Sequence, residues 1–494
     1  MYYIGVDLGT SAVKLLLMSA DGKIKNVVSR EYKLYFPHPG WSEQNPDDWW
    51  NATCDGLKEL ISGVDKSEVK GIGVAGQMHG LVILDSDDKV IRKAILWNDG
   101  RTNKETDYLN NDIGKKKISV WTGNIAFPGF TAPKILWVKE NEKENFAKIN
   151  KIMLPKDYIN YKLTGAFATD YSDASGMLLL DVENKKWSKE MLDLCNISEY
   201  MLPRLYESYE VIGELKPEVA DAIGLDKNVK VVAGAGDNAA AAIGTGTVGN
   251  GACNISIGTS GTVFISSDKF IVDDACSLHS FAHSDGKYHL MGCMLSAAAN
   301  YKWWLDNVLE SSDYQGESDI IKREKLGNNH IYYLPYLMGE RAPHNDPYAR
   351  ACFIGMTMDT KRADMTLAIY EGVAYGIRDS VEAARKMGID VKKSMICGGG
   401  SKNPLWRDIF ANVLNIELTT LVTEQGPGYG GAILAAVACG EYPDVKAATE
   451  KLVKIKDVVK PNKELVEKYE IAYQKFRRLY PALKEVFEAN IANV

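Results

Sequence analysis

The chain has 494 residues, of which 46% are hydrophobic, and its 58 basic and 65 acidic residues give a formal net charge of −7. Because this length exceeds the size at which a single hydrophobic core stops growing, two domains are expected. The weakly acidic balance argues against a nucleic-acid or acidic-membrane partner, which would attract a basic surface, yet it leaves room for one bound nucleotide.

Cysteine usage and hydropathy point to the cell interior. The eight cysteines are scattered, and no two of them form a Cys-x-x-Cys pair, which favours a reducing compartment over a disulfide framework or a zinc ribbon. The N-terminus lacks the features of an export signal, and the least charged stretch, residues 231–267, is rich in Gly, Ala, Thr and Ser. It would make a poor membrane span. We therefore predict a cytoplasmic protein without a membrane partner.

The first half of the chain opens with a predicted β-hairpin. Apolar residues 3–6 and 13–18 flank a Gly-Thr-Ser turn at residues 9–11. A helix is expected to begin at Asn45-Pro46, with a capping residue, a proline at the first helical position and acids in the first turn. Residues 69–74 form the next predicted strand. Residues 231–233 form another, followed by Gly-Ala-Gly-Asp-Asn and a helix to residue 243.

The second half repeats the opening pattern. Residues 254–267 again predict a strand, a Gly-Thr-Ser-Gly-Thr turn and a second strand, so we expect a twofold plan with domains 1–245 and 246–494. Residues 395–397 predict a strand before three glycines, and a helix begins at Asn403-Pro404. A single final amphipathic helix is expected to carry Leu465, Tyr469, Tyr473, Phe476 and Tyr480. This alternation of strands and helices predicts an α/β fold.

Two hairpin tips are candidates for holding phosphate groups. Phosphate loops need glycine and hydroxyl donors, and the sequence has no G-x-x-x-x-G-K-[ST] motif. A single small-residue tip is usually an ordinary turn, but a pair facing across a cleft could hold a triphosphate from both sides. Asp7 adjoins the first tip and suits a Mg²⁺ contact. The tip residues are Thr10 and Ser11 in the first half and Gly258, Thr259, Ser260 and Gly261 in the second.

Asp237 is the candidate catalytic residue. At the end of a buried strand it could simply cap the helix that follows, or it could act as the general base that takes a proton from an attacking sugar hydroxyl. Asn238 could cap the same helix or bind a sugar hydroxyl. Gln77, Met78 and His79 lie just past a strand end, where open α/β sheets place ligands, so a polyol site is plausible there. A lone histidine, however, is more often structural.

Other positions keep two interpretations. Gly398, Gly399 and Gly400 could let a flat base lie against the backbone, or they could form a loop that needs positive φ. His279 and His283 are four residues apart, but they fall in a strand-like stretch that does not favour a metal site. The pair Trp303-Trp304 is most simply explained as core.

The chain resembles the FGGY carbohydrate kinases over essentially its whole length. The blocks that carry the resemblance are YIGVDLGTSAVK (3–14), GWSEQNPDDWW (40–50), GVAGQMHGLVILD (73–85), LWNDGR (96–101), GFTAPKILWVKEN (129–141), LPKDYINYKLTG (154–165), GAGDNAA (234–240), IGTSGTVF (257–264), YLPYLMGERAPHND (333–346) and ICGGGSKNPLWRDIFANVL (396–414). One departure is mild, since Ala235 stands where some relatives have glycine.

The resemblance implies two ribonuclease-H-like domains, as in the actin and hexokinase ATPases, with an active-site cleft between them. ATP, Mg²⁺ and the ketopentose D-xylulose are the implied partners. Asp237 corresponds to the family's catalytic base, and Asp7 corresponds to the aspartate that lies near the magnesium ion. Met78 and His79 fall on the sugar pocket. The phosphate loops fall on Thr10 and Ser11 and on residues 259–261, and the adenosine site falls on Gly398, Gly399, Gly400 and Asn403.

Three alternatives stay open from the sequence. The acceptor could be ribulose, another pentulose or an alditol. The chain could instead be a non-catalytic actin-like protein, or a sugar-sensing regulator. The oligomeric state cannot be read from the sequence, and a homodimer is one option.

Overall fold

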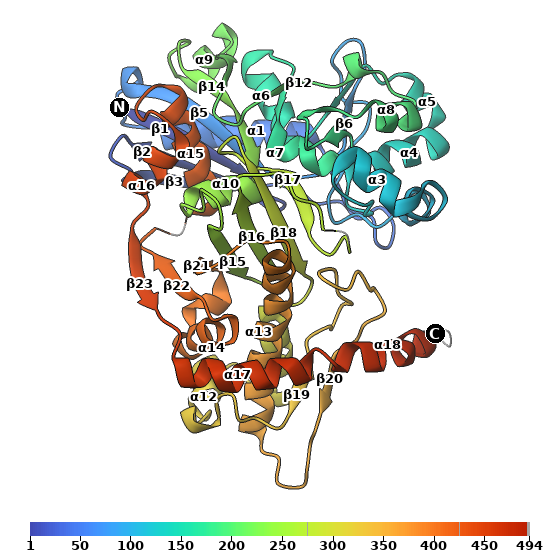
Figure 1. The fold of residues 1–494 in the computed structure, drawn as a ribbon. Helices are drawn as coiled ribbons and strands as arrows, with labels where there is room; N and C mark the ends of the chain where they lie inside the picture. Colours follow the sequence, from blue (N-terminus) through green and yellow to red (C-terminus); the bar gives the residue numbers. More distant parts are fainter. Residues whose placement is uncertain (274, 424, 492–494) are drawn as a thin grey trace.

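Two mixed β-sheets organise the molecule (Figure 1). The structure is a computed structural model that describes residues 1–273, 275–423 and 425–491. In both sheets an antiparallel hairpin is followed, on one side, by strands that run parallel to its first strand. The predicted twofold plan and the α/β, ribonuclease-H-like fold are confirmed.

The first sheet has the order β13-β14-β5-β1-β2-β3. The hairpin β1–β2 lies next to β3 on one side, and β5 and β14 continue the sheet in parallel on the other. The six strands are β1 (Tyr2–Leu8), β2 (Ala12–Ser19), β3 (Ile24–Glu31), β5 (Val69–Gly76), β13 (Val211–Glu214) and β14 (Lys230–Gly236).

The second sheet has the order β17-β18-β16-β15-β21-β22-β23. Here β15–β16 is the hairpin, and β21 and β22 are the parallel strands. The seven strands are β15 (Cys253–Ile257), β16 (Gly261–Ser267), β17 (His279–Ala282), β18 (Tyr288–Met294), β21 (Lys393–Cys397), β22 (Glu417–Leu421) and β23 (Ile455–Val459). Shorter two-stranded pairs are formed by β4 (Glu43–Gln44) with β7 (Ala94–Ile95), β6 (Val82–Leu84) with β8 (Lys151–Met153), β9 (Ala168–Asp170) with β12 (Arg204–Tyr206), β10 (Leu180–Asp181) with β11 (Lys186–Trp187), and β19 (Tyr332–Leu334) with β20 (Cys352–Ile354).

Helices cover the sheets and connect their strands. In the first half they are α1 (Pro46–Leu60), α2 (Asn103–Asp107), α3 (Lys115–Thr122), α4 (Thr131–Asn141), α5 (Lys143–Ala147), α6 (Pro155–Thr164), α7 (Tyr171–Ala174), α8 (Lys189–Cys195), α9 (Pro217–Ile223) and α10 (Asp237–Gly244). In the second half they are α11 (Ala298–Trp303), α12 (Tyr314–Asp319), α13 (Arg362–Lys386), α14 (Pro404–Leu414), α15 (Gly426–Ala438), α16 (Val445–Leu452), α17 (Lys463–Phe476) and α18 (Leu479–Ile491). One-turn π-helical segments follow α2 and α11, at Tyr108–Gly114 and Trp304–Leu309.

Helix α15 belongs to the second half of the sequence but packs on the first sheet (Figure 1). Its glycines let two backbones come together, since a Cβ at Gly5 of β1 would collide with the carbonyl oxygen of Gly428. On its other side a Cβ at Gly430 would collide with the carbonyl oxygen of Ala240, in α10. The helix therefore lies between the sheet and α10. The domain boundary near residue 245 stays a prediction.

Most of the predicted elements are present. Asn45 caps α1 by accepting a hydrogen bond from the N–H of Asp47, and both hairpins form. The single final helix was wrong: α17 ends at Phe476 and α18 begins at Leu479. The physical reason is Pro481, which has no N–H to bond the carbonyl of Arg477 and whose ring would clash with that carbonyl in a continuous helix.

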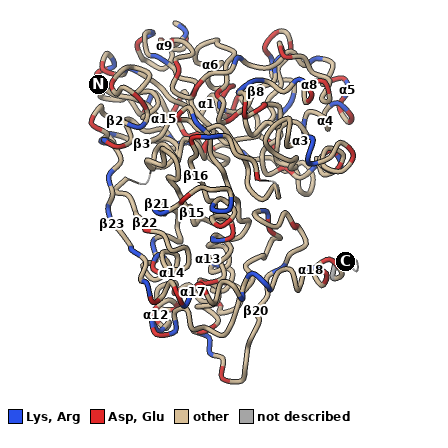
Figure 2. The backbone as a smooth tube through the Cα atoms, in the orientation of Figure 1, with Lys and Arg blue, Asp and Glu red and all other residues tan. Residues whose placement is uncertain are grey.

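Charge and hydropathy add two simple findings. Figure 2 shows Lys and Arg interspersed with Asp and Glu along both halves of the chain. Within the described residues, no helix is both long enough and apolar enough to cross a membrane.

Candidate active site

Three parallel strands of the first sheet end side by side. Leu8 of β1 pairs with Gly76 of β5, and Gly76 pairs in turn with Gly236 of β14. The residues that follow these strand ends therefore share one edge of the sheet. In this way the fold brings together the Gly-Thr-Ser tip, the Gln-Met-His segment and the Asp-Asn pair, three groups that are far apart in the sequence.

Asp237 stands at this edge as the first residue of α10. The helix is capped at Gly236 without a side-chain hydrogen bond, so the carboxylate does not serve as the cap that the sequence allowed. Instead its Oδ1 accepts hydrogen bonds from the backbone N–H and the Nδ2 of Asn238, at 2.8 and 3.2 Å. Burial, together with the negative charge of Asp7, raises the pKa of Asp237 to about 7. A carboxylate with this pKa can accept a proton near neutral pH.

Asp7 is the second carboxylate at this edge. Burial raises its pKa to about 6, although the positive charge of Lys14 acts in the opposite direction. Across the described ranges, the side chain of Asp7 makes no hydrogen bond or ion pair. Two neighbouring carboxylates, one of which raises the pKa of the other, form an arrangement suited to a bound cation.

The first hairpin tip is held by a network of side-chain amides and hydroxyls. The carbonyl of Thr10 accepts a hydrogen bond from Gln44 Nε2 at 2.6 Å, and its hydroxyl accepts one from Trp97 Nε1 at 2.9 Å. The same hydroxyl donates to Gln77 Oε1 at 3.4 Å, and Gln77 Nε2 donates to Gln44 Oε1 at 3.0 Å. Gln77 is 2% exposed. The structure thus places Gln77 behind the tip as one of its supports, whereas Ser11 is exposed.

Met78 and His79 lie next to the Asp-Asn pair. Asn238 Nδ2 stands 3.8 Å from the sulfur of Met78. His79 has a φ of 68°, an uncommon backbone conformation for a non-glycine residue. Its carbonyl accepts hydrogen bonds from Lys134 Nζ at 2.8 Å and Thr131 Oγ1 at 3.1 Å, which hold that conformation.

The imidazole of His79 is neutral at physiological pH. Burial is the main cause, the charges of Lys134 and Arg341 add to it, and together they lower the pKa to about 3. The ring stacks on Phe130 with 4.6 Å between centroids, and its Nδ1 lies 2.7 Å from the carbonyl oxygen of Gly176. His79 can therefore present a hydrogen-bonding edge to a ligand without adding positive charge.

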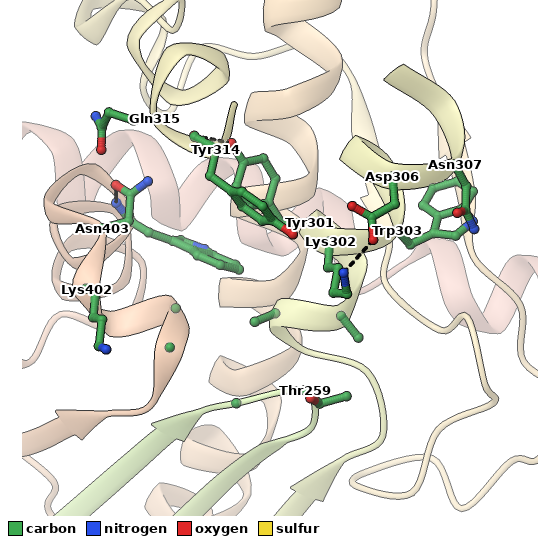
Figure 3. A pocket seen from close by; sticks show the side chains of 16 residues that line it. Thr259, Tyr301, Lys302, Trp303, Asp306, Asn307, Tyr314, Gln315, Lys402 and Asn403 are labelled. Atoms are coloured by element: carbon green, nitrogen blue, oxygen red, sulfur yellow. Dashed lines mark hydrogen bonds and ion pairs between the residues drawn. The ribbon is translucent and has the colours of Figure 1, made fainter. Parts of the chain in front are cut away.

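The corresponding edge of the second sheet borders a cavity of about 880 Å³ (Figure 3). Ser256 of β15 pairs with Cys397 of β21, so the second tip and the three-glycine segment follow adjacent strand ends. Five of the predicted nucleotide-binding residues line this cavity: Gly258, Thr259, Gly399, Gly400 and Asn403. Ser260, Gly261 and Gly398 adjoin the lining but are not part of it, and Thr10 and Ser11 belong to the first edge.

The glycine segment contains the positive-φ loop that the sequence allowed, and its role beside a flat base stays a prediction. Gly398 has a φ of 87°, and a Cβ there would press on the backbone of Ile257 at 2.7 Å, so this position needs glycine. A Cβ at Gly399 would meet nothing within 4 Å, so that residue leaves open space beside the cavity. Asn403 caps α14 through its Oδ1, and its Nδ2 donates to Ser318 and Tyr370.

Sequence reasoning missed most of the cavity wall. Figure 3 shows Tyr301, Trp303, Tyr314 and Gln315 around it, and Lys302 ion-paired with Asp306. Trp304 is buried as expected, and its neighbour Trp303 packs against the core while also lining the cavity. Lys134 and Thr131 were missed as well. They lie in a quoted block, 129–141, but no local pattern in it indicates which backbone carbonyl they bind.

A mixed sheet that carries Asp237 and a Gly-Thr-Ser tip, beside a second mixed sheet that borders a cavity of about 880 Å³, is the arrangement of an actin-like ATPase fold. Residues 2–244 match the N-terminal domain of the FGGY family of carbohydrate kinases, and residues 253–439 match the C-terminal domain of that family. The chain belongs to the FGGY family and is an ATP-dependent carbohydrate kinase.

Individual relatives are similar along their whole length. The xylulose kinase of Escherichia coli (strain K12) is 39% identical over 483 residues, covering 97% of this chain and 99% of the relative. The structure of ligand-bound xylulose kinase from Lactobacillus acidophilus superposes with a TM-score of 0.94 at 27% identity, covering 99% of each chain. A gluconate kinase from the same organism gives a TM-score of 0.93 at 27% identity, covering 98% of each chain.

Proposed function

We propose that this kinase transfers the γ-phosphoryl group of ATP to the terminal hydroxyl of D-xylulose, giving D-xylulose 5-phosphate and ADP. The observation that carries the proposal is the state of Asp237. Its carboxylate is not used to cap α10, and its pKa is raised to about 7 by burial and by Asp7. A base with that proton affinity is half ionised at neutral pH and becomes a competent acid once it has taken a proton.

In the proposed mechanism Asp237 accepts the hydroxyl proton while the hydroxyl oxygen attacks the γ-phosphorus in line with the departing ADP. General-base assistance of this kind is worth about 10²–10⁴ in rate, and positioning and charge neutralisation supply much of the remainder. Asn238, which donates two hydrogen bonds to Asp237, fixes the direction of the carboxylate.

We assign the sugar to the first edge and the nucleotide to the second. Met78, His79 and Asn238 would contact the sugar, with Gln77 holding the tip behind them. Gly399, Gly400 and Asn403 would border the adenosine. Thr10, Ser11 and the second tip, Gly258 to Gly261, would face the phosphates, with Gly398 setting the adjoining turn. The support for this division is the cavity on the second sheet, which has the volume of a nucleotide site and an aromatic wall.

Mg²⁺ is the metal that we propose to accompany ATP. No group of three or more His, Cys, Asp or Glu side chains suited to a metal ion occurs in the described part of the chain. Mg²⁺ in phosphoryl-transfer enzymes is commonly held by one or two carboxylates and the substrate phosphates. Asp7, whose carboxylate has no other partner, fits that pattern, with Asp237 nearby. When bound, the ion would neutralise charge on the phosphates.

D-Xylulose is preferred over other acceptors because the E. coli relative named xylulose kinase is 39% identical along the chain. The gluconate kinase has a nearly equal TM-score but only 27% identity, which makes gluconate the first competitor to test. Ribulose and alditols remain in the same test. A homodimer and a cytoplasmic location stay predictions.

The deciding experiment is ADP release over a panel of D-xylulose, D-ribulose, L-ribulose, D-gluconate, glycerol and xylitol, each with MgATP. We expect D-xylulose to give the highest kcat/KM. A higher value for any other member overturns the proposed acceptor and leaves the kinase class in place. ATP hydrolysis that no sugar changes would overturn the proposed reaction.

A further inference from the structure

An arginine of the second half of the chain lies near His79, where its charge adds to burial in lowering the pKa of that imidazole. Arg341 lies in the loop between β19 and β20, and its side chain is half-buried. Its guanidinium carbon stands 4.8 Å from the ring centroid of Phe127. Among the residues that the structure describes, that guanidinium has no hydrogen-bond acceptor and no ion-pair partner.

The adjacent carboxylate does not neutralise Arg341. Glu340 Oε1 accepts hydrogen bonds from the backbone N–H groups of Leu295 and Arg341, at 3.0 and 2.7 Å. Burial raises the pKa of Glu340 to about 8, which favours the protonated form at neutral pH, although the charge of Arg341 acts in the opposite direction. A guanidinium is always charged and only donates hydrogen bonds. A half-buried guanidinium that bonds no acceptor in the described residues is therefore free to donate hydrogen bonds to an acceptor on a ligand.

The position of Arg341 is fixed by an aromatic series that leads back to His79. Phe127, below the guanidinium, stands 5.0 Å from the ring of His279 and 5.5 Å from that of Phe130, and Phe130 stacks on His79. The charge of Arg341 contributes to the lowered pKa of both His79 and His279. The two imidazoles near it are thus neutral and do not repel it.

The same series reaches Asp237 at its other end. Asn238, beside Asp237, stands 3.8 Å from the sulfur of Met78, and Met78 precedes His79 in the chain. Asp237 and Arg341 therefore lie toward opposite ends of one series of neighbouring side chains, Asn238–Met78–His79–Phe130–Phe127, in which Phe130 is 1% exposed. A short linear molecule whose reacting hydroxyl lies at Asp237 would have its far end toward Arg341.

Elementary sugar chemistry states what that far end carries. In a 2-ketopentose the five-membered hemiketal ring closes through the C5 oxygen. A ketopentose whose C5 hydroxyl is free to attack phosphorus is therefore in the open-chain form, with a free ketone at C2. The ketone oxygen accepts hydrogen bonds and cannot donate them, which makes it a partner for a group that only donates.

We propose that Arg341 is a specificity-determining residue that donates to the carbonyl oxygen of the open-chain sugar and so selects carbonyl-bearing acceptors over alditols; this rests on the proposed function. An alditol places a hydroxyl there, whose own proton would need an acceptor beside the ring of Phe127. A site built to hydrogen-bond one polar group rejects analogues that lack it more strongly than an apolar pocket can.

The test compares R341Q with wild type on two substrate pairs: D-xylulose with xylitol, and D-gluconate with D-glucitol. R350Q is the matched control, because Arg350 lies in the same loop and binds only the backbone carbonyls of Pro347 and Ala349. We expect R341Q to raise KM for the carbonyl-bearing substrate about 10- to 100-fold, since hydrogen bonds to charged groups are the strong class. The kcat/KM for the alditol should change less than about threefold, and KM for ATP and Tm should stay unchanged.

Two further measurements keep the outcomes distinct. Calorimetric titration of D-xylulose without ATP should show the same loss of affinity, and R341K should recover part of it, because lysine keeps the charge but not the planar fork. Equal losses for the ketose and the alditol, or no loss for either, overturn the inference. So does a wild-type enzyme that uses xylitol as well as D-xylulose. A wild type that prefers D-gluconate overturns the proposed acceptor instead, and the D-gluconate and D-glucitol pair then decides the role of Arg341.

Discussion

The two hairpin tips share the sequence Gly-Thr-Ser but differ in what their hydroxyls do. In the first, the hydroxyl and the carbonyl of Thr10 are engaged by Trp97, Gln77 and Gln44. In the second, Thr259 and Ser260 are exposed, and within the described residues their hydroxyls make no hydrogen bond. The second tip is held by its backbone instead, since the carbonyls of Gly258 and Thr259 accept hydrogen bonds from the N–H groups of Ala298 and Ala297.

A local motif therefore sets the shape of a turn, whereas the residues packed around the turn determine which of its atoms are free to bind a ligand. The strand residues before the tips differ too: the first tip follows Asp7, and Ser256 occupies the matching place in the second. One tip is therefore rigid and carries a charge beside it, and the other is neutral with free hydroxyls.

The largest effect, on kcat, is expected from replacing the proposed general base, Asp237. Asp237→Asn should lower kcat about 10²–10⁴-fold, because the amide cannot accept the hydroxyl proton. Steady-state ADP release measures this, and Asp55→Asn, on the exposed side of α1, is the control for loss of one carboxylate. Retention of a tenth or more of wild-type kcat would contradict the assignment of Asp237 as the base.

The same variant should be more stable than wild type. The pKa of Asp237 is about 7 in the folded chain and near 4 when unfolded. The folded state therefore becomes less stable relative to the unfolded state as pH rises from about 4 to about 7. Above that range the loss is constant, at about 1.4 kcal/mol per unit of pKa shift. We expect Asp237→Asn to raise Tm at pH 8 and to give no gain below about pH 4. Equal Tm values at pH 8 would argue against the raised pKa.

A pH profile tests the ionisation of Asp237, which lies at the same edge of the first sheet as the first tip. Because Asp237 must be ionised to act, kcat/KM should fall about tenfold for each unit of pH below about 7. The profile is measured with ATP and D-xylulose over pH 5 to 9. An acid limb that lies near pH 4 instead would mean that burial and Asp7 do not raise the proton affinity in solution.

Breaking the network of the first tip should destabilise the fold. Gln44 is fully buried, and Gln44→Leu leaves the Nε1 of Trp49 without its acceptor, the carbonyl of Thr10 without the donor Gln44 Nε2, and Gln77 Nε2 with one acceptor fewer. The expected cost is about 2–4 kcal/mol, from two or more unsatisfied buried groups. Thermal melting measures it, with Gln315→Leu as the exposed counterpart in the second half. An unchanged Tm would show that the network does not stiffen the tip.

The smallest effect is expected at the second tip. Thr259→Val removes an exposed hydroxyl that bonds no other residue, so stability should change by less than about 0.5 kcal/mol. The KM for ATP should rise about 3- to 10-fold, the usual value of one hydrogen bond. Initial-rate kinetics at varied ATP measure it. Thr10→Val should give the converse pattern, a lower Tm with a smaller change in KM for ATP. Equal effects of the two variants on Tm and on KM would contradict the proposed difference between the two tips.

What could be predicted from the sequence was local. The two hairpins, the cap at Asn45 and the strand before Asp237 depend on neighbouring residues and formed as expected. The break between α17 and α18 also depends on a local residue, Pro481, but the sequence analysis did not predict it. In contrast, the role of Lys134 on the carbonyl of His79, the placement of Arg341 over Phe127 and the turn of Trp303 toward the cavity depend on contacts between distant segments. No periodicity or motif encodes such contacts.

The position of α15 has a consequence for how the protein is made. The last strand of the first sheet, β14, ends at Gly236, but the helix that packs against β1 and holds α10 in place ends at Ala438. During translation the first sheet therefore emerges from the ribosome long before the segment that covers it. In the nascent chain, the apolar face of the first sheet that α15 covers stays exposed until most of the second half has been synthesised. Only then does α10, which carries Asp237, reach its final position.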